Sequence, residues 1–393
     1  MFSPIVRTVL TAALLLLGGI PRLLGAELDP IGPGPFSVGS TNMEVMAPAG
    51  QPMGDFLNGK VTPQHPVYLA DILTHPESAF ALQVAVPADR KTFGAHAGTR
   101  IPLVLYVLYP TTKDNPRADY TFPYTETGDN VFPHMQRAGE KPIFPDAAAR
   151  YPLIVYSGGY NTHGLWHLSH LKWLASHGYI VVDIFHGDNR WESFGSAMAV
   201  RPLEFRAALD FVLQHADFVH AIDVDRIGAS SASAGGHTIL CAMGGINPAS
   251  PNPSLADPRI KAGFGLVPFM GSSMGIWPFK QDAWYFGKDY AGLRSVRVPF
   301  FAVYGEKDGN VVPAGVEAGV RAMSGPATAV MLDGETHSLS GSTTSDVNTW
   351  EILFFDAWLR DDAHAHQLLE TGTSVRGGVN DHRTIQHGAR TQR

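Results

Sequence analysis

One segment near the middle of the chain restricts the possible folds more than any other. Residues 226–229 form a short apolar run suited to a buried strand, and residues 234–241 form a run of small and apolar residues suited to a closely packed helix. Between them lies Ser233, with Ser231 two residues before it and Gly235 two residues after it. The chain must turn tightly here, so these flanking positions must be small. The segment predicts a sharp strand-to-helix turn that presents one serine.

The pattern around this serine departs from the usual one. Such a turn normally reads Gly-x-Ser-x-Gly, and here Ser231 stands at the first position. Taken alone, the segment also fits a loop rich in serine and glycine that only joins two elements. Features elsewhere in the chain are needed to choose between these interpretations.

Partners for a reactive serine lie downstream. A serine hydroxyl is a poor nucleophile at neutral pH, so it needs a histidine to accept its proton and a carboxylate to orient that histidine. Asp308 follows the apolar run 299–304, and His337 follows the apolar run 329–332. Both runs are typical of buried strands. Because the order Ser, Asp, His after successive strands is that of an α/β-hydrolase, we predict Ser233, Asp308 and His337 as a catalytic triad.

Such a triad needs two backbone N–H groups that bind the oxyanion. Ala234, the residue after the serine, is predicted to supply the first. The second usually comes from the loop after an earlier strand, and here the apolar run 151–156 is followed by Ser-Gly-Gly-Tyr. The glycines let the backbone approach a substrate carbonyl, so Tyr160 is the candidate for the second donor. Its ring either lies against an acyl or aromatic group or packs on the strand.

Several stretches of the chain together resemble one family. These stretches are residues 151–159, 174–182, 186–189, 201–205, 207–210 and 225–233. They are similar to the secreted type of platelet-activating factor acetylhydrolase and to related dienelactone hydrolase-like esterases of bacteria, over roughly residues 80–360. The resemblance implies an α/β-hydrolase fold and the hydrolysis of esters.

Two departures from this family bear on the acid and on the substrate. Members that resemble the mammalian lipase form have His-Gly where this chain has Gly158 and Gly159. They also place their acid directly after the strand that follows the nucleophile helix, and the corresponding residues 265–269 contain no carboxylate. The second departure favours Asp308, the position used by most α/β-hydrolases, and specificity for phospholipids stays open.

Composition and the order of the predicted elements agree with a large α/β domain. The chain has 393 residues, 45% of them hydrophobic, which is enough for a sizeable core. Its 29 basic and 36 acidic residues give a net charge of −7, so nothing points to nucleic acid. Predicted strands and helices alternate, which indicates a doubly wound, mostly parallel sheet with a nucleophile elbow in a single domain. The apolar runs 80–86 and 103–109 are expected to form a hairpin at its start.

The N-terminus has the features of a secretory signal. Residues 1–26 contain an apolar run that is too short for a comfortable membrane span, and Ala26 offers a small residue for cleavage. We therefore predict a signal peptide and a secreted or periplasmic protein, with an uncleaved membrane anchor as the alternative. The single cysteine, Cys241, leaves no intramolecular disulfide.

The remaining chain divides into a catalytic domain and a tail. The domain is expected to span residues 27–360 and to begin with an irregular wrap over residues 27–78, which are rich in Pro, Gly and Met without clear periodicity. Residues 361–393 lose hydrophobic content and are predicted to be a polar C-terminal tail without a chemical role.

Three histidines raise the question of a metal. His163, His167 and His170 follow the i, i+4, i+7 spacing of one helix face. No carboxylate is spaced to complete a zinc site, so polar decoration of a helix is the favoured interpretation and we predict no metal and no other cofactor.

Four residues are predicted to line the substrate pocket. His186 lies in a loop expected to end near the rim of the active site, where it either lines the pocket or fixes the loop. Phe269, Met270 and Trp277 follow the strand after the nucleophile helix. Their aromatic and thioether side chains suit an apolar acyl or aryl group, and they suit core packing equally well.

Together these features predict a secreted serine ester hydrolase of the carboxylesterase or lipase type that forms an acyl-enzyme. Within that class a phospholipid acetylhydrolase and a polyester depolymerase stay open, and the substrate is a small-molecule, lipid or polymer ester. A catalytically silent hydrolase fold used for binding is the alternative from another class. Peripheral contact with a lipid or hydrophobic surface is compatible with the sequence, which does not fix the natural ester, its acyl length or the oligomeric state.

Overall fold

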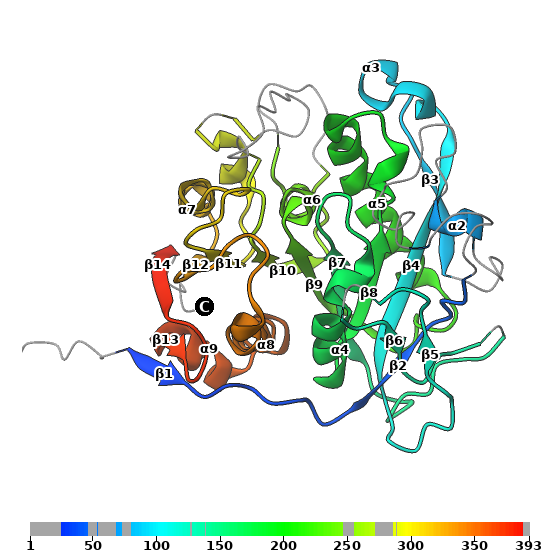
Figure 1. Ribbon diagram of the computed structural model, residues 1–393, viewed down its shortest axis with the longest axis horizontal. Helices are drawn as coiled ribbons and strands as arrows, with labels where there is room; N and C mark the ends of the chain where they lie inside the picture. The colour runs from blue at the N-terminus through cyan, green and yellow to red at the C-terminus, as the bar shows by residue number, and fades with distance from the viewer. Residues whose placement is uncertain are drawn as a thin grey trace, which may run out of the picture.

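The structure is a computed structural model that describes residues 25–45, 53, 68–72, 80–125, 128–137, 139–246, 255–271, 286–287 and 289–387. A ten-stranded, mostly parallel sheet runs through its centre (Figure 1). The strands of this sheet are β2 (Ser37–Ser40), β3 (Ala81–Ala85), β4 (Arg100–Thr111), β7 (Tyr151–Ser157), β8 (Ile180–Phe185), β9 (Ile222–Ala232), β10 (Ile260–Leu266), β11 (Phe300–Gly305), β12 (Ala327–Leu332) and β14 (Asp381–His387).

The order of the strands across the sheet is β14-β12-β11-β10-β9-β7-β8-β4-β2, with β3 also paired to β4. From β12 to β8 all neighbours are parallel, whereas β14 at one edge and β4, β2 and β3 at the other pair antiparallel. Two smaller sheets pair β1 (Ala26–Leu28) with β13 (Gly372–Val375), and β5 (Tyr120–Thr121) with β6 (Val131–Phe132).

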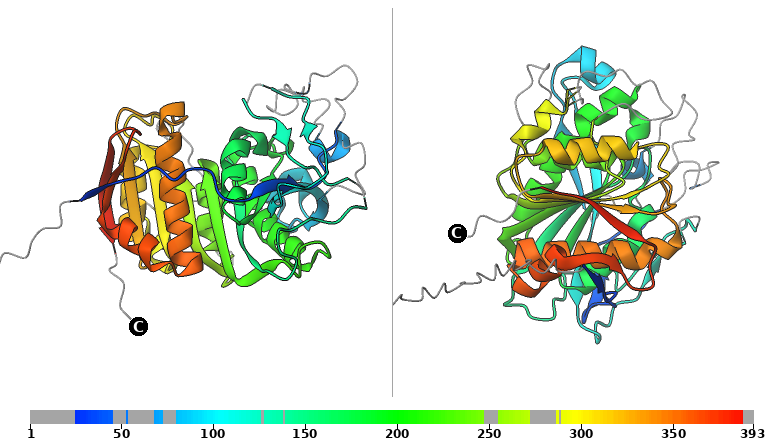
Figure 2. Two further views of the ribbon diagram at one scale, coloured as in Figure 1. Left: turned by 90° about the horizontal axis from the view of Figure 1, so that it is seen from below. Right: turned by 90° about the vertical axis from the view of Figure 1, so that its left-hand side faces the viewer.

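Helices cover both faces of the central sheet, as the edge-on view in Figure 2 shows. The helices of the described residues are α2 (Leu69–Ile72), α3 (Arg90–Phe93), α4 (Leu168–Ser176), α5 (Phe194–Gln214), α6 (Ala234–Ala242), α7 (Pro313–Ala322), α8 (Thr344–Arg360) and α9 (Ala363–Thr371). Helices α5, α6 and α7 lie on one face, and α4 and α8 lie on the other, with α9 beside α8.

The sequence of the central strands explains this layering. Every residue of β7 and of β8 is buried, as expected for parallel strands covered on both faces. Each face has its own core. Fully buried Leu209 and Ile239 contribute to the core beneath α5 and α6, and fully buried Leu171, Trp350 and Phe355 contribute to the core beneath α4 and α8.

Several predictions about the fold can be compared with these elements. The mostly parallel sheet is confirmed, and so is the opening hairpin, because β3 and β4 pair antiparallel. The irregular wrap is in part regular, since β1 pairs with β13 and β2 pairs with β4.

The C-terminal segment differs from the predicted polar tail. Up to His387 it forms α9, β13 and β14, and β14 closes one edge of the central sheet against β12. The buried side chains of this segment include Leu369, Val375 and Ile385, and the Trp350 Nε1–H donates to Asp381 Oδ2 over 2.7 Å. A short edge strand is held largely by backbone hydrogen bonds, so low hydrophobic content hid it from the sequence.

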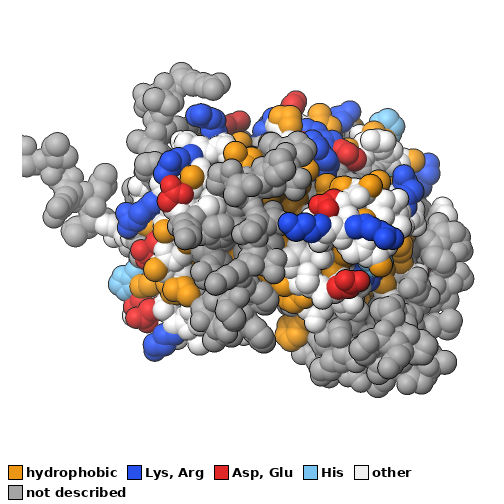
Figure 3. Space-filling view, turned by 90° about the horizontal axis from the view of Figure 1, so that it is seen from above, with side chains coloured by type: hydrophobic (Ala, Val, Ile, Leu, Met, Phe, Trp, Pro, Cys, Tyr) orange, Lys and Arg blue, Asp and Glu red, His pale blue; other side chains and the backbone are white. Residues whose placement is uncertain are grey.

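The predicted signal peptide and the charge of the chain can also be compared with the structure. Most of the predicted signal peptide lies outside the described residues, and within the described ranges no helix is long and apolar enough to cross a membrane. On the face seen in Figure 3, the described basic and acidic side chains are interspersed. This mixture suits the modest net charge of the chain.

Candidate active site

The predicted sharp turn is present, with Ser233 at its tip. Strand β9 ends at Ala232, helix α6 begins at Ala234, and Ser233 between them has φ 49° and ψ −118°. A positive φ is costly for a residue with a Cβ and persists only where the surroundings hold it. Here the Ser233 N–H donates to the Leu266 carbonyl over 2.9 Å, and its own carbonyl accepts the Phe269 N–H over 2.8 Å. The loop after β10 therefore clamps the turn.

The small residues around Ser233 allow strand and helix to approach. A Cβ on Gly235 would lie 1.8 Å from the backbone oxygen of Ser157, at the end of the neighbouring strand β7. Ser231 is fully buried, and its hydroxyl donates to the Phe264 carbonyl over 3.2 Å. A serine can therefore replace the usual first glycine of the pattern because its polar atom has a partner inside the sheet.

The three predicted triad residues come together. His337 Nε2 lies 2.9 Å from Ser233 Oγ, and His337 Nδ1 lies 2.8 Å from Asp308 Oδ2. The other carboxylate oxygen of Asp308 accepts the backbone N–H groups of Asn310 and Val311, each over 2.8 Å. The carboxylate is thus fixed by the backbone at one oxygen and bonded to the imidazole at the other.

The burial of these side chains is graded from acid to nucleophile. The Asp308 side chain is fully buried, while that of His337 keeps 20% of its surface exposed and Ser233 is half-buried. Ser233 follows β9, Asp308 follows β11 and His337 follows β12, all at the carboxyl ends of parallel strands. This edge is where open parallel sheets bind their ligands.

The predicted oxyanion residues lie beside the serine. Ala234 is the first residue of α6, so its N–H has no acceptor within the helix. A Cβ on Gly159 would lie 3.5 Å from the Ser233 Cβ. The backbone of Gly159, the residue before Tyr160, therefore lies close to the Ser233 side chain. The Tyr160 ring packs edge-on against Phe194, with 4.8 Å between ring centroids, and stays 37% exposed. The ring therefore packs on the protein in part and keeps an exposed part.

Arg201 and Asp188 organise the same loop, and sequence reasoning missed this role. Arg201 Nη1 donates to the Gly158 carbonyl over 2.7 Å and Nη2 to the Gly159 carbonyl over 2.6 Å. Its Nε and Nη2 bond the two carboxylate oxygens of Asp188 over 2.9 and 2.7 Å. The available signal was an arginine inside the apolar run 197–203, because a buried arginine needs partners.

His186 is buried instead of lying at an exposed rim. It is 2% exposed, with Nε2 2.8 Å from Ser157 Oγ and Nδ1 2.6 Å from Glu204 Oε2. Burial lowers the pKa of His186 well below its usual value and raises that of Glu204 to about 8, so neutral forms of both are favoured. The structural alternative, fixing the loop, is the one that the contacts support.

The predicted apolar pocket wall also belongs largely to the core. Phe269 is 1% exposed and Met270 is fully buried. Met270 packs closely on α7, because a Cβ added to Gly319 would lie 2.7 Å from the terminal methyl of Met270. Apolar side chains directly after a buried strand are drawn into the core beneath the adjoining helices. Trp277 lies outside the described residues.

The three histidines have separate surroundings. His163 precedes the helix, since α4 begins at Leu168, and this breaks the expected helical spacing. His170 Nδ1 lies 2.9 Å from Asn348 Oδ1, and its Nε2 pairs with Glu351. Burial lowers the pKa of His163 and of His167 to about 3, which keeps both neutral. In the described part of the chain, no three His, Cys, Asp or Glu side chains are placed to hold a metal ion.

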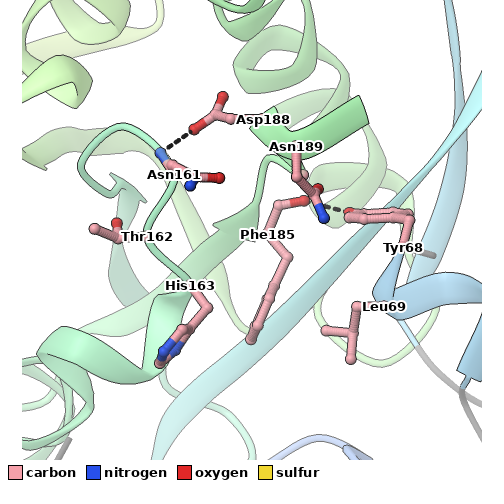
Figure 4. Close-up of a pocket in the computed structure, with 9 residues that line it drawn as sticks. Tyr68, Leu69, Asn161, Thr162, His163, Phe185, Asp188 and Asn189 are labelled. Carbon is pink, nitrogen blue, oxygen red and sulfur yellow. Dashed lines mark hydrogen bonds between the residues drawn. The ribbon is translucent and has the colours of Figure 1, made fainter. Parts of the chain in front are cut away.

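A small cavity lies beside residues 161–163, which follow Tyr160 in the chain (Figure 4). Its volume of about 30 Å³ is enough for one or two water molecules. It is lined by Tyr68, Leu69, Asn161, Thr162, His163, Phe185, Gly187, Asp188 and Asn189. None of the triad residues lines it, so it is separate from the site of the serine.

Comparison with known proteins adds nothing to this geometry. No model of a known protein family matches the chain, and no curated protein is significantly similar to it. The chemistry available to the site follows from its geometry alone: a hydroxyl bonded to an imidazole, and an imidazole oriented by a buried carboxylate. Such an arrangement can transfer an acyl group through the serine.

Proposed function

We propose that this chain is a secreted serine hydrolase that cleaves carboxylic esters. The observation that carries the proposal is the unbroken chain of contacts from Asp308 through His337 to Ser233, with 2.8 and 2.9 Å between the bonded atoms. In the first half-reaction Ser233 Oγ attacks the ester carbonyl carbon, and His337 Nε2 accepts the proton of the Ser233 hydroxyl. The imidazole then gives the proton to the departing alcohol, which leaves an acyl-enzyme.

The second half-reaction repeats these steps with water. His337 takes a proton from the water as it attacks the acyl carbon, and returns that proton to Ser233 Oγ as the carboxylic acid leaves. Asp308 orients the imidazole and stabilises its charged form throughout. The N–H groups of Ala234 and Tyr160 stabilise the negative oxygen of each tetrahedral intermediate.

The arrangement of the sheet supports an α/β-hydrolase fold. In that fold the nucleophile sits on a strand-to-helix turn in a parallel sheet, with the acid and then the histidine after later strands. Here the strained turn follows β9, Asp308 follows β11 and His337 follows β12, in the strand order β9-β10-β11-β12. Complete triad geometry also favours an enzyme over a catalytically silent binding protein.

Exposed apolar side chains favour an ester with an apolar acyl or aryl group. Tyr160, next to the proposed oxyanion hole, is 37% exposed, and Val312, which follows the loop of Asp308, is 39% exposed. Sites that bind small molecules are lined mostly by apolar and aromatic side chains around a few polar groups. Short-chain and aryl carboxylesters are therefore the first substrates to test, with phospholipids and polyesters next.

Two experiments test the proposal. The first is labelling with a fluorophosphonate followed by peptide mapping, and the second is an assay with p-nitrophenyl esters of increasing acyl length. Ser233→Ala is expected to abolish labelling and to lower kcat by at least about 10⁴-fold, because the nucleophile is lost. Ser231→Ala is the matched control, since this neighbouring hydroxyl only bonds a strand carbonyl. Ser230 is a poorer control because its hydroxyl donates to buried Glu351 over 2.7 Å.

Two results would contradict the assignment. One is a folded wild-type protein that neither reacts with the fluorophosphonate nor turns over any ester of the series. The other is loss of turnover in Ser231→Ala with turnover retained in Ser233→Ala. The first outcome would favour a binding protein on this scaffold, and the second would move the nucleophile.

A further inference from the structure

Four hydrogen bonds hold one fully buried guanidinium behind the loop of Tyr160. Arg201 is fully buried, and it divides its donors between Asp188 and two backbone carbonyls, those of Gly158 and Gly159. Asp188 in turn accepts the Asn161 N–H over 2.7 Å, as drawn in Figure 4. Backbone groups before and after Tyr160 are therefore tied to one buried ion pair.

The hydrogen bond from Arg201 to the Gly159 carbonyl fixes the direction of the Tyr160 N–H. In a trans peptide the carbonyl of one residue and the N–H of the following residue point in opposite directions, and the described residues contain no cis peptide. Because the Gly159 carbonyl points at Arg201, the Tyr160 N–H points away from it. The Gly158 carbonyl fixes the preceding peptide in the same manner. The loop thus turns its carbonyls toward α5 and keeps its N–H groups for the other side.

The same peptide is polarised as well as oriented. The Gly159 carbonyl accepts from the charged Arg201 over 2.6 Å and also from Thr162 Oγ1 over 2.9 Å. Hydrogen bonds from charged donors are the stronger kind, and bonds in a chain strengthen one another. A peptide with an engaged carbonyl is a better donor at its N–H, which here belongs to Tyr160.

We propose that Arg201, oriented by Asp188, is a positioning residue that sets and polarises the Tyr160 N–H for the oxyanion. The inference rests on the proposed function, since it concerns the hole that stabilises the tetrahedral intermediate. A purely structural role is the competing explanation. However, a buried ion pair is no more stabilising than well-packed apolar side chains, so its presence alone does not account for the two carbonyl contacts.

Three variants on helix α5 test the proposal against that explanation. Arg201→Met removes all four bonds, and Arg201→Lys keeps the charge but loses the planar fork that reaches both carbonyls and the carboxylate. Arg206→Met is the matched control, because Arg206 is exposed on the same helix. For each variant we would count active sites by end-point reaction of Ser233 with the fluorophosphonate, and measure kcat per site, KM and the inhibition constant of a boronic acid.

A boronic acid forms a tetrahedral adduct with the serine, so its affinity reports the oxyanion hole. We expect Arg201→Met to lower kcat per site by about 10²-fold, as does loss of one oxyanion donor, with KM within about threefold. The affinity for the boronic acid should fall by a similar factor. Arg201→Lys should give values of kcat per site and of boronate affinity between those of Arg201→Met and wild type, and Arg206→Met should give wild-type values. A structural role would lower only the melting temperature and the fraction of active sites.

Thr162→Val gives a second route if the Arg201 variants do not fold. It removes the hydrogen bond from the Thr162 hydroxyl to the Gly159 carbonyl while nearly conserving the shape of the side chain, and the backbone N–H of residue 162 still donates to that carbonyl over 3.4 Å. We expect kcat per site to fall about three- to tenfold, the effect of one hydrogen bond. The proposal is overturned if folded Arg201→Met retains kcat per site within twofold of wild type, or if the Arg201 variants do not fold and Thr162→Val is unchanged. Wild-type protein that fails to label would instead overturn the proposed function.

Discussion

Replacing Asp308 with asparagine isolates the role of its charge. One carboxylate oxygen accepts two backbone N–H groups, from Asn310 and Val311, and the other faces His337 Nδ1 at 2.8 Å. Asparagine can satisfy those two donors only with its amide oxygen, so its NH₂ group must face the imidazole. Nδ1 then has to accept a hydrogen bond, and the ring proton moves to Nε2. In that tautomer His337 cannot take the proton of Ser233.

The expected loss in kcat is about 10⁴-fold, or about 5.4 kcal/mol in the activation free energy, as for other triads locked in the wrong tautomer. The melting temperature should change little, because the side chain keeps its shape and the two backbone donors keep an acceptor. Burst and steady-state kinetics with a p-nitrophenyl ester measure the first quantity, and thermal denaturation measures the second.

The control is Asp333→Asn, in the loop that precedes His337. Asp333 pairs with His382 at the surface over 2.8 Å and should be dispensable for turnover. Equal losses in the two variants, or a loss confined to Asp333→Asn, would refute the assignment of the acid. A loss below tenfold in Asp308→Asn would refute the tautomer argument.

Two further predictions concern stability. Gly235→Ala puts a Cβ 1.8 Å from a backbone oxygen of β7 and should lower the free energy of unfolding by about 3 kcal/mol or more. Gly341→Ala, where a Cβ meets nothing within 4 Å, should leave this free energy unchanged. Equal effects of the two variants in urea denaturation would contradict the clash. Burial raises the pKa of Asp183 to about 8, so the folded chain keeps a proton that the unfolded chain releases near pH 4. The free energy of unfolding should therefore fall by up to about 1.4 kcal/mol per pH unit from about pH 4 to about pH 8, and Asp183→Asn should remove that part of the slope. An unchanged slope in the variant would show that Asp183 does not hold the proton.

The proximity of Ser233, Asp308 and His337 was predictable because the last two follow strongly apolar runs and Ser233 lies in a run of small residues between a predicted strand and a predicted helix. Ser233 directly follows β9, Asp308 and His337 lie in the loops after β11 and β12, and parallel strands bring their carboxyl ends to one edge of a sheet. Local sequence therefore carried most of the information. Ser231 in place of glycine was tolerable for a reason that only the structure gives, the hydrogen bond of its hydroxyl to the Phe264 carbonyl.

Residues whose role depends on partners far along the chain were harder to assign. His186 looked like a rim residue because its loop ends at the correct edge, but Glu204 and Ser157 hold its ring inside the protein. The segment after β10 is predicted from the sequence to form a pocket wall, but Phe269 and Met270 are core residues. Hydrophobicity indicates burial and does not say whether a ligand or the protein covers the side chain.

The spacing of the sheet also explains why Asp308 and Ser233 can contact one imidazole. Strands β9 and β11 are separated only by β10, and two strand spacings correspond to roughly 10 Å. An imidazole that bonds at both nitrogens, 2.9 Å from Ser233 Oγ and 2.8 Å from Asp308 Oδ2, spans part of that distance, and the side chains of Ser233 and Asp308 span the rest. His337 reaches both side chains from the loop after β12, the strand next to β11. A carboxylate after β10 would have to lie one strand closer to the serine, and the chain has none there. The position after β11 therefore suits both the sheet and the reach of the ring.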